Sequence, residues 1–238
     1  MTENQLHRYR LGIIGNCSYI AYIDDRAAVR WLCMPRFDSS FLFGSLLDPD
    51  RGGEFSIKPA GSFAAHQHYI ENTNILCTEF KAADGWFRVT DFAPRFYQYD
   101  RYFRPMMLVR KIEPMQGQPR ITVKCVPVGD YGRIQPEIVL GSNHIRYLNL
   151  GGHVRLTTDL SLSYIVDGRP FVLIITGADP ICPGCRFRFA YTAWTPFIVT
   201  STTRFSGLVP VFLPEIVTST FLPESTELCE HFISSKIM

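Results

Sequence analysis

Apolar and polar residues alternate along most of the chain, and a period of two is typical of β-strands with one buried and one exposed face. The alternating runs are rich in Val, Ile, Tyr, Phe and Thr, which favour strands, and turn-forming Gly, Pro, Asp and Asn separate them. The pattern predicts strands at 18–23, 28–33, 54–58, 75–81, 86–92, 106–113, 120–126, 144–150, 153–158 and 170–176. Many short strands with turns between them indicate an all-β fold, an antiparallel sandwich.

Two segments depart from this pattern. One short helix is expected at 39–47, where Ser39 or Ser40 would cap the first turn and the Asp48-Pro49 pair would end the helix. After Asp179 the chain contains no Asp, Asn or Gln, while Thr, Ser, Pro and Phe become frequent. We therefore divide the chain into a β-sandwich at 1–179 and an atypical tail at 180–238. An insertion, an altered reading frame and a poorly ordered extension would each explain such a tail.

The composition of the chain limits the kinds of partner and the compartment that we expect for this protein. The 238 residues suffice for one large all-β domain with a substantial core. Lys and Arg number 24 against 22 Asp and Glu, and a formal charge of +2 gives no reason to expect a nucleic acid or an acidic membrane as partner. The N-terminus has no signal-peptide pattern, and no apolar run approaches the roughly 20 residues that span a bilayer. With seven dispersed cysteines, a cytoplasmic protein with reduced thiols is expected.

Motifs for several kinds of chemistry are missing from the sequence. It has neither a phosphate-binding glycine loop nor the Gly-x-Ser-x-Gly turn of a serine hydrolase, and we expect no cofactor. His66 and His68 share one face of a possible strand, but no neighbouring ligand completes a metal site, so we interpret them as surface residues. The Cys182-Pro183-Gly184-Cys185 spacing has no second cysteine pair and is interpreted as coincidence.

Two segments are candidates for recognition. Arg36, Phe37 and Asp38 follow a predicted strand and combine planar donors, an aromatic face and an acceptor, which suits a sugar or a carboxylate. The alternative is an Arg–Asp brace at a corner of the fold, or Asp38 as the cap of the predicted helix. The aromatic and cationic run at 95–104 offers Tyr97, Tyr99 and Tyr102 for stacking on sugar rings, or for pinning a long loop to the sandwich.

Three stretches of the sequence also carry a family resemblance. They are 14–59, which contains Trp-Leu-Cys-Met-Pro-Arg-Phe-Asp-Ser, 69–95, which ends in Val-Thr-Asp-Phe-Ala-Pro-Arg, and 108–133, which ends in Asp-Tyr-Gly-Arg. Over about residues 11–178 the chain resembles the N-terminal domain of bacterial and archaeal glycoside hydrolase family 15 proteins, the glucoamylase-like and trehalase-like enzymes. Asn16 stands where that family usually has Asp, and Arg26-Ala27 replaces its Asp-Gly turn, which predicts a strained or longer turn because alanine tolerates positive φ poorly.

The resemblance implies a β-supersandwich that precedes a catalytic α/α-barrel. In such inverting enzymes two barrel glutamates would act, one as acid and one as base, about 6.5–9.5 Å apart. The chain is expected to stop before that barrel and therefore to hold no catalytic residue, with Arg36, Phe37 and Asp38 at the rim of the sugar pocket. The expected partners are the barrel and an α-glucan or trehalose-type sugar.

Two other hypotheses belong to different classes of protein. The chain could be a free-standing module that binds an α-glucan or a partner protein through its aromatic run. It could instead be an enzyme in its own right that uses a carboxylate pair such as Asp91 and Glu113, which is the least favoured of the three.

Overall fold

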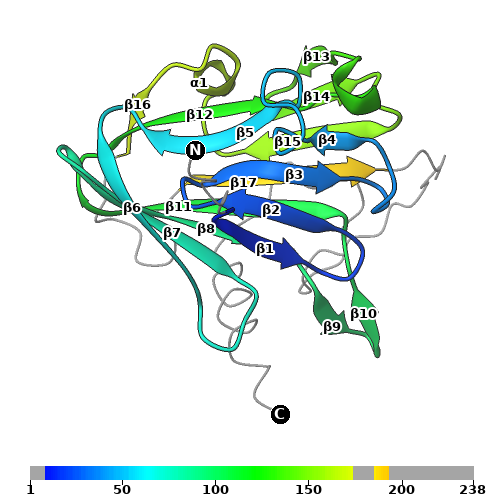
Figure 1. The fold of residues 1–238 in the computed structure, drawn as a ribbon, viewed down its shortest axis with the longest axis horizontal. Coiled ribbons are helices and arrows are strands. Elements are labelled where there is room, and N and C mark those ends of the chain that lie inside the picture. The colour runs from blue at the N-terminus through cyan, green and yellow to red at the C-terminus, as the bar shows by residue number, and fades with distance from the viewer. Residues whose placement is uncertain (1–8, 174–184, 193–238) are drawn as a thin grey trace, which may run out of the picture.

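Two antiparallel β-sheets face each other in the computed structural model, which describes residues 9–173 and 185–192 (Figure 1). The first sheet has seven strands: β1 (Leu11–Gly15), β2 (Ile20–Asp24), β3 (Ala28–Cys33), β5 (Glu54–Pro59), β12 (Arg120–Val126) and β16 (Phe171–Val172) in spatial order, with β4 (Phe41–Phe43) paired to β3. The second has eight: β13 (Glu137–Leu140), β14 (His144–Leu148), β15 (His153–Thr158), β17 (Cys185–Thr192), β11 (Met107–Gly117), β8 (Gly85–Phe92), β7 (Leu76–Ala82) and β6 (Phe63–Tyr69). The predicted antiparallel sandwich is confirmed.

Three smaller elements complete the described structure. A hairpin of β9 (Phe96–Gln98) and β10 (Arg101–Phe103) forms a separate two-stranded sheet. The helix α1 (Leu162–Val166) packs on β12, and a 3-10 turn, η1 (Asp130–Gly132), follows β12. No helix within the described residues is long and apolar enough to cross a membrane.

The core lies between the two sheets and consists of the inward-facing residues of the alternating strands. Phe43 and Phe55 from the seven-stranded sheet contact Phe189 of the eight-stranded sheet, with ring centroids 5.1 and 5.9 Å apart. All three side chains are fully buried. Aromatic rings of this size each bury a large apolar area, so this contact between the sheets is a main source of stability.

One ion pair is buried within this apolar core. Arg110 of β11 and Asp91 of β8 lie directly opposite each other, both fully buried, and form a bidentate pair with N–O distances of 2.7 and 3.1 Å. The guanidinium also donates to the carbonyl oxygens of Phe55 and Ala27 in the other sheet, at 3.0 and 2.6 Å. Burial raises the pKa of the Asp91 carboxyl, and Arg110 opposes that rise. The pair therefore joins the two sheets through fully bonded polar groups.

The turn between β2 and β3 has the strain that the sequence predicts. Ala27 adopts φ +54°, in the left-handed region where a side chain is unfavourable. The Asp24 carboxylate compensates by accepting the backbone N–H groups of Arg26 and Ala28, at 3.0 and 2.8 Å. The Ala27 carbonyl in turn receives Arg110, so the strained turn supports the buried ion pair.

The helix predicted at 39–47 is wrong. The structure places the strand β4 (Phe41–Phe43) there, paired with β3 and buried along all three residues. A turn follows, in which the Leu47 and Asp48 N–H groups bond to the Gly44 carbonyl. An apolar run this short has no readable period, and the neighbouring β3 edge offered hydrogen bonds along the run.

The strand β17 lies beyond residue 179, where the composition of the chain changes. It pairs with β15 on one side and β11 on the other, near the middle of the eight-stranded sheet. Phe187, Phe189 and Tyr191 point into the core, which is the alternation expected of a strand. Residues 174–184 and 193–238, the rest of the predicted tail, lie outside the described residues.

Candidate functional site

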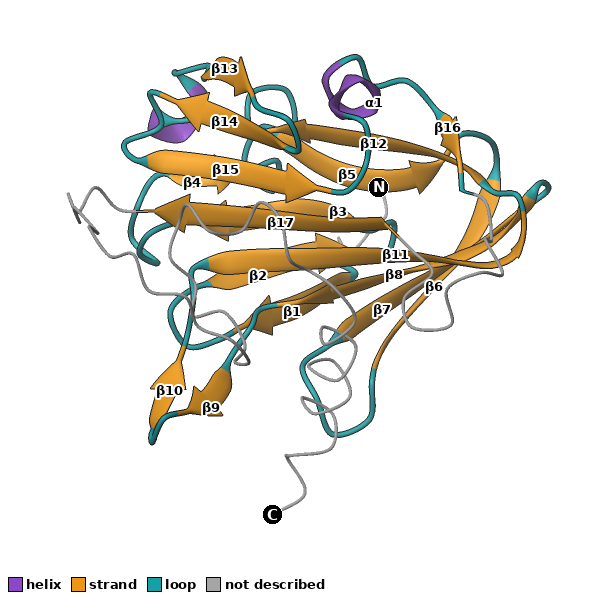
Figure 2. Ribbon diagram, turned by 180° about the vertical axis from the view of Figure 1, so that it is seen from behind, coloured by secondary structure: helices purple, strands orange, loops and turns teal. Residues whose placement is uncertain are grey.

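The two predicted recognition segments lie at the same end of the sandwich. Figures 1 and 2 show the connection from β3 to β4, the β9–β10 hairpin and the η1 turn at one end of the two sheets, seen from opposite sides. Loops at the end of a rigid sandwich are a common place for binding residues. This end of the molecule, which we call the recognition end, is the candidate functional site.

Arg36 and Asp38 form an ion pair that is open to solvent. The Arg36 Nε and Nη2 atoms donate to the two Asp38 carboxylate oxygens at 2.8 and 3.0 Å, and the side chains are 76% and 70% exposed. The hydrogen bond from Arg36 lowers the pKa of the Asp38 carboxyl, so Asp38 is ionised at neutral pH. Phe37, between them, is 54% exposed.

This geometry weakens the interpretation of Arg36 and Asp38 as a structural brace. Exposed ion pairs contribute little to stability because water screens them and because fixing two long side chains costs entropy. Asp38 cannot cap a helix at 39–47, since that segment is the strand β4. The connection itself is held by its backbone: Arg36 and Ser39 bond reciprocally, with Arg36 N–H to the Ser39 hydroxyl and Ser39 N–H to the Arg36 carbonyl.

Sequence reasoning missed a further residue of the recognition end, Tyr131. Its side chain is 55% exposed, and its backbone N–H donates to the Ser40 hydroxyl at 3.0 Å. Its ring and that of Phe41 are nearly perpendicular, with centroids 5.7 Å apart, so the η1 turn lies beside the connection from β3 to β4. The Asp-Tyr-Gly sequence, a turn-forming triplet with an aromatic residue at its centre, was the available signal.

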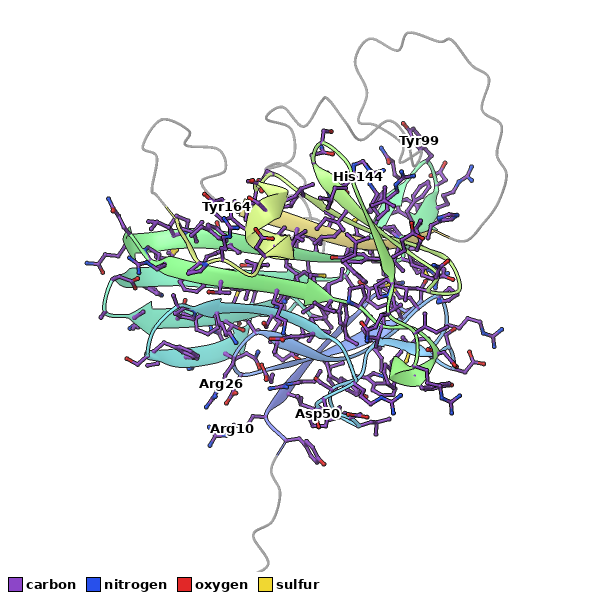
Figure 3. All side chains as sticks on the ribbon, turned by 90° about the horizontal axis from the view of Figure 1, so that it is seen from above. Arg10, Arg26, Asp50, Tyr99, His144 and Tyr164 are labelled. Atoms are coloured by element: carbon purple, nitrogen blue, oxygen red, sulfur yellow. The ribbon has the colours of Figure 1, made fainter. Side chains whose placement is uncertain are left out.

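The aromatic run at 95–104 forms a hairpin whose tyrosines point away from the sandwich. Tyr97, Tyr99 and Tyr102 are 58%, 53% and 62% exposed, and Figure 3 shows Tyr99 outside the two sheets. Tyr97 and Tyr102 contact each other at 4.9 Å, and the Arg95 guanidinium lies over the Tyr102 ring at 5.2 Å. The three tyrosines are thus mostly exposed rather than packed against the sandwich.

Asn16 holds the base of this hairpin. Its side-chain amide, 1% exposed, donates to the carbonyl oxygens of Pro94 and Pro105 at 2.9 and 2.8 Å, one at each end of the hairpin. The side-chain carbonyl oxygen of Asn16, Oδ1, accepts the Ser18 N–H at 3.1 Å. A carboxylate cannot donate these two bonds, which gives a physical reason for asparagine at this position.

The two carboxylates that could form a catalytic pair do not converge. Asp91 is fully buried against Arg110, whereas Glu113 lies three residues from Arg110 on the same strand and hence on the opposite face. Glu113 is bonded to Lys111 at 2.7 Å. The two carboxyl groups thus have separate partners on separate faces of the sheet.

The remaining candidates of the sequence give no metal site in the described part of the chain. His66 and His68 stack on β6 with ring centroids 5.4 Å apart and are exposed. Within residues 9–173 and 185–192, no three His, Cys, Asp or Glu side chains gather as metal ligands. Cys182, the first cysteine of the predicted pair, lies outside the described residues. A small apolar cavity of about 150 Å³ between α1 and β12, lined by Cys125, Tyr147 and Ile165 among others, lies apart from every predicted site residue.

Two facing antiparallel sheets, with exposed aromatic and charged residues in the connections at one end, define a β-sandwich domain. Comparison with known families is more specific. The chain belongs to the trehalase-like N-terminal family, whose model matches residues 2–156. No solved structure matches the chain.

Several curated relatives are trehalases that extend well beyond the matched segment. Trehalase 1 of Sulfolobus acidocaldarius is 35% identical over 140 residues, which cover 58% of this chain and 23% of the relative. The trehalases of Thermoplasma volcanium and Mycolicibacterium smegmatis are 34% and 32% identical, over 53% and 52% of this chain and 20% of each relative. The match thus spans about a fifth of the length of these relatives.

Proposed function

We propose that this chain serves as the non-catalytic N-terminal domain of a trehalase-like hydrolase of the glycoside hydrolase family 15 type, acting on α-glucosides. The observation that carries the proposal is the family match together with its extent. The relatives named trehalase match over about a fifth of their length, so four fifths of each lies outside the segment they share with this chain.

The chemistry supports a division of labour between this domain and a neighbour. Inverting hydrolysis needs an acid and a base on opposite sides of the glycosidic bond, about 6.5–9.5 Å apart. Asp91 and Glu113 point to opposite faces of a sheet, and the Asp91 carboxylate is already paired with Arg110. We therefore assign catalysis to an α/α-barrel partner domain, and to this domain the recognition end, with Arg36, Phe37 and Asp38 at the rim of the sugar pocket.

The net charge of the chain supports an uncharged ligand, and its free thiols support a reducing compartment. The near-neutral net charge of +2 suits an uncharged sugar rather than a nucleic acid or an acidic membrane. Cys17, Cys33, Cys77 and Cys125 are free thiols, which supports a reducing, cytoplasmic compartment. Burial raises the pKa of Cys33 to about 11 and that of Cys125 to about 12, so neither is a reactive thiolate at neutral pH. No cofactor is needed for this role.

The purified 238-residue chain is expected to release no glucose from trehalose or maltose, because catalysis is assigned to the partner domain. A coupled glucose assay measures this, with a full-length trehalase from one of the named relatives as the positive control. Glucose release that survives purification and disappears with Asp91→Asn or Glu113→Gln would instead make the chain an enzyme in its own right.

A second candidate function is a free-standing α-glucan-binding module, favoured by the accessible tyrosines of the hairpin. Exposed aromatic faces beside arginines are common in binding surfaces. In this case the chain is retained on an amylose column, and the double variant Tyr97→Ala/Tyr102→Ala elutes with the void volume. Tyr164→Ala, which removes a 37% exposed tyrosine on α1, is the matched control and stays retained. Elution of the unaltered chain with the void volume excludes this candidate.

A further inference from the structure

The η1 turn holds three consecutive residues in the left-handed region. The φ angles are +43° at Asp130, +54° at Tyr131 and +84° at Gly132. Glycine adopts this conformation readily and aspartate tolerates it, whereas a tyrosine is unfavourable there. Strained residues of this kind persist where the surrounding structure enforces them, and they concentrate at functional sites.

Burial does not account for the tyrosine. More than half of the Tyr131 side chain is exposed, and its ring lies nearly perpendicular to that of the buried Phe41, with centroids 5.7 Å apart. A glycine at 131 would fit the backbone better and would lose little apolar contact. The strained turn therefore presents an aromatic ring to solvent at a conformational cost that packing does not explain.

The turn that carries the ring adjoins the connection that carries the exposed ion pair. Tyr131 N–H bonds to the hydroxyl of Ser40, and Ser39, the preceding residue, bonds reciprocally with Arg36. The turn and the connection from β3 to β4 are thus joined through two adjacent serines. The recognition end therefore presents an exposed aromatic ring, a guanidinium and a carboxylate on two adjoining connections.

We propose that Tyr131, together with the Arg36–Asp38 pair, binds one pyranose ring of a neutral α-glucoside. A pyranose has an apolar C–H face, which stacks on an aromatic ring, and hydroxyl groups, which accept from a guanidinium and donate to a carboxylate. Because Arg36 and Asp38 neutralise each other, the site favours an uncharged ligand over a phosphate or an acid. The choice of an α-glucoside rests on the proposed function, whereas the site itself rests on the turn.

Backbone and side-chain NMR of the intact chain tests this site, with trehalose and maltose as probes and open-chain ribitol as the non-ring control. Trehalose or maltose is expected to shift the signals of Tyr131, Phe37 and Asp38, and ribitol is not. Tyr131→Gly is expected to weaken sugar binding about five- to tenfold, as the loss of one aromatic contact does. Tyr131→Phe keeps the ring and is expected to bind like the unaltered chain.

Thermal stability separates binding from packing. Tyr131→Gly is expected to keep or raise the melting temperature, because glycine relieves the left-handed strain, while it loses sugar affinity. A lower melting temperature with unchanged sugar affinity would show that Tyr131 is a packing residue and would overturn the proposal. Should the glycine variant fail to fold, Tyr131→Asn, which also tolerates this backbone, replaces it.

The control variants locate the site. Asp38→Ala is expected to weaken trehalose binding, and Tyr164→Ala on α1 is expected to leave it unchanged. The reverse pattern, or the absence of any sugar-induced shift at the recognition end, overturns the inference. Either result leaves the proposed non-catalytic role standing, since that role fails only if the chain itself releases glucose.

Discussion

Asp91→Ala is expected to destabilise the sandwich by about 3–5 kcal/mol, because it leaves the Arg110 guanidinium buried without its counter-charge. Arginine remains protonated in proteins, so it cannot escape this cost by losing its proton. The two carbonyls that Arg110 reaches, at Phe55 and Ala27, belong to the other sheet, and a displaced guanidinium would also loosen the contact between the sheets. Urea denaturation followed by tryptophan fluorescence measures the free energy of unfolding.

The double variant Asp91→Ala/Arg110→Met is the decisive comparison for this prediction. With both charges removed, an apolar side chain of similar length fills the site, and much of the lost stability is expected to return. Asp38→Ala is the matched control, since it breaks a bidentate pair of similar geometry that is exposed, and it is expected to leave the unfolding midpoint unchanged. Equal losses at Asp38 and Asp91 would show that burial is not the cause.

Asn16→Asp is expected to cost at least about 2 kcal/mol, because the buried side chain loses both hydrogen bonds that its amide donates and gains a charge. The substitution is nearly isosteric, but it removes both donors to Pro94 and Pro105 and places a carboxylate against two carbonyl oxygens. The hairpin is expected to lose its fixed position, since those two bonds close its base. Hydrogen exchange of residues 95–104, together with urea denaturation, measures both effects.

Asn74→Asp is the matched control for this substitution. The Asn74 amide also donates to a backbone carbonyl, that of Gly15 at 2.6 Å, but the bond is exposed, so water replaces it. This variant is expected to keep the hairpin protected and the stability within experimental error. Unchanged hydrogen exchange at 95–104 in Asn16→Asp would contradict the role of Asn16 in holding the base of the hairpin.

Alternation along the chain was sufficient to predict the sandwich, because strands with one buried face carry a period of two that tertiary contacts reinforce. The same pattern places Leu108, Arg110 and Ile112 on one face of β11, although arginine is a residue type that is usually exposed. Arg110 follows the alternation and is buried, since Asp91 and two carbonyls satisfy it. Residue type alone would not have predicted its burial.

The segment 39–47 and the strand β17 were missed for a different reason. Three or four apolar residues fit a helix or a strand equally well, and pairing with a neighbouring strand, here β3, decides between them. The alternation Arg-Phe-Arg-Phe-Ala-Tyr at 186–191 was visible, but the unusual composition around it kept this strand from being recognised. The strands that pair with β17, namely β11 and β15, are distant from it in the sequence.

The candidate site was predicted in part. The segments around Arg36 and Tyr97 were selected for their residue types, and the structure shows both to be exposed. Tyr131 could not be placed beside the connection from β3 to β4 from sequence, because about 90 residues separate it from Ser40, to which its backbone N–H donates. The hydrogen bonds from Asn16 to Pro94 and Pro105 are equally long-range. In the sequence, only the departure from the family's aspartate drew attention to position 16.

The position of β17 has a consequence for how the chain is made. When a ribosome has synthesised the chain as far as β16, β11 and β15 still lack the strand that lies between them, and each presents an open row of backbone donors and acceptors. Such rows attract other strands, so the nascent polypeptide is vulnerable to wrong pairing until residue 192 leaves the exit tunnel. Assembly of the larger sheet is therefore a late event in biosynthesis, and slow translation before codon 185 would prolong the exposure.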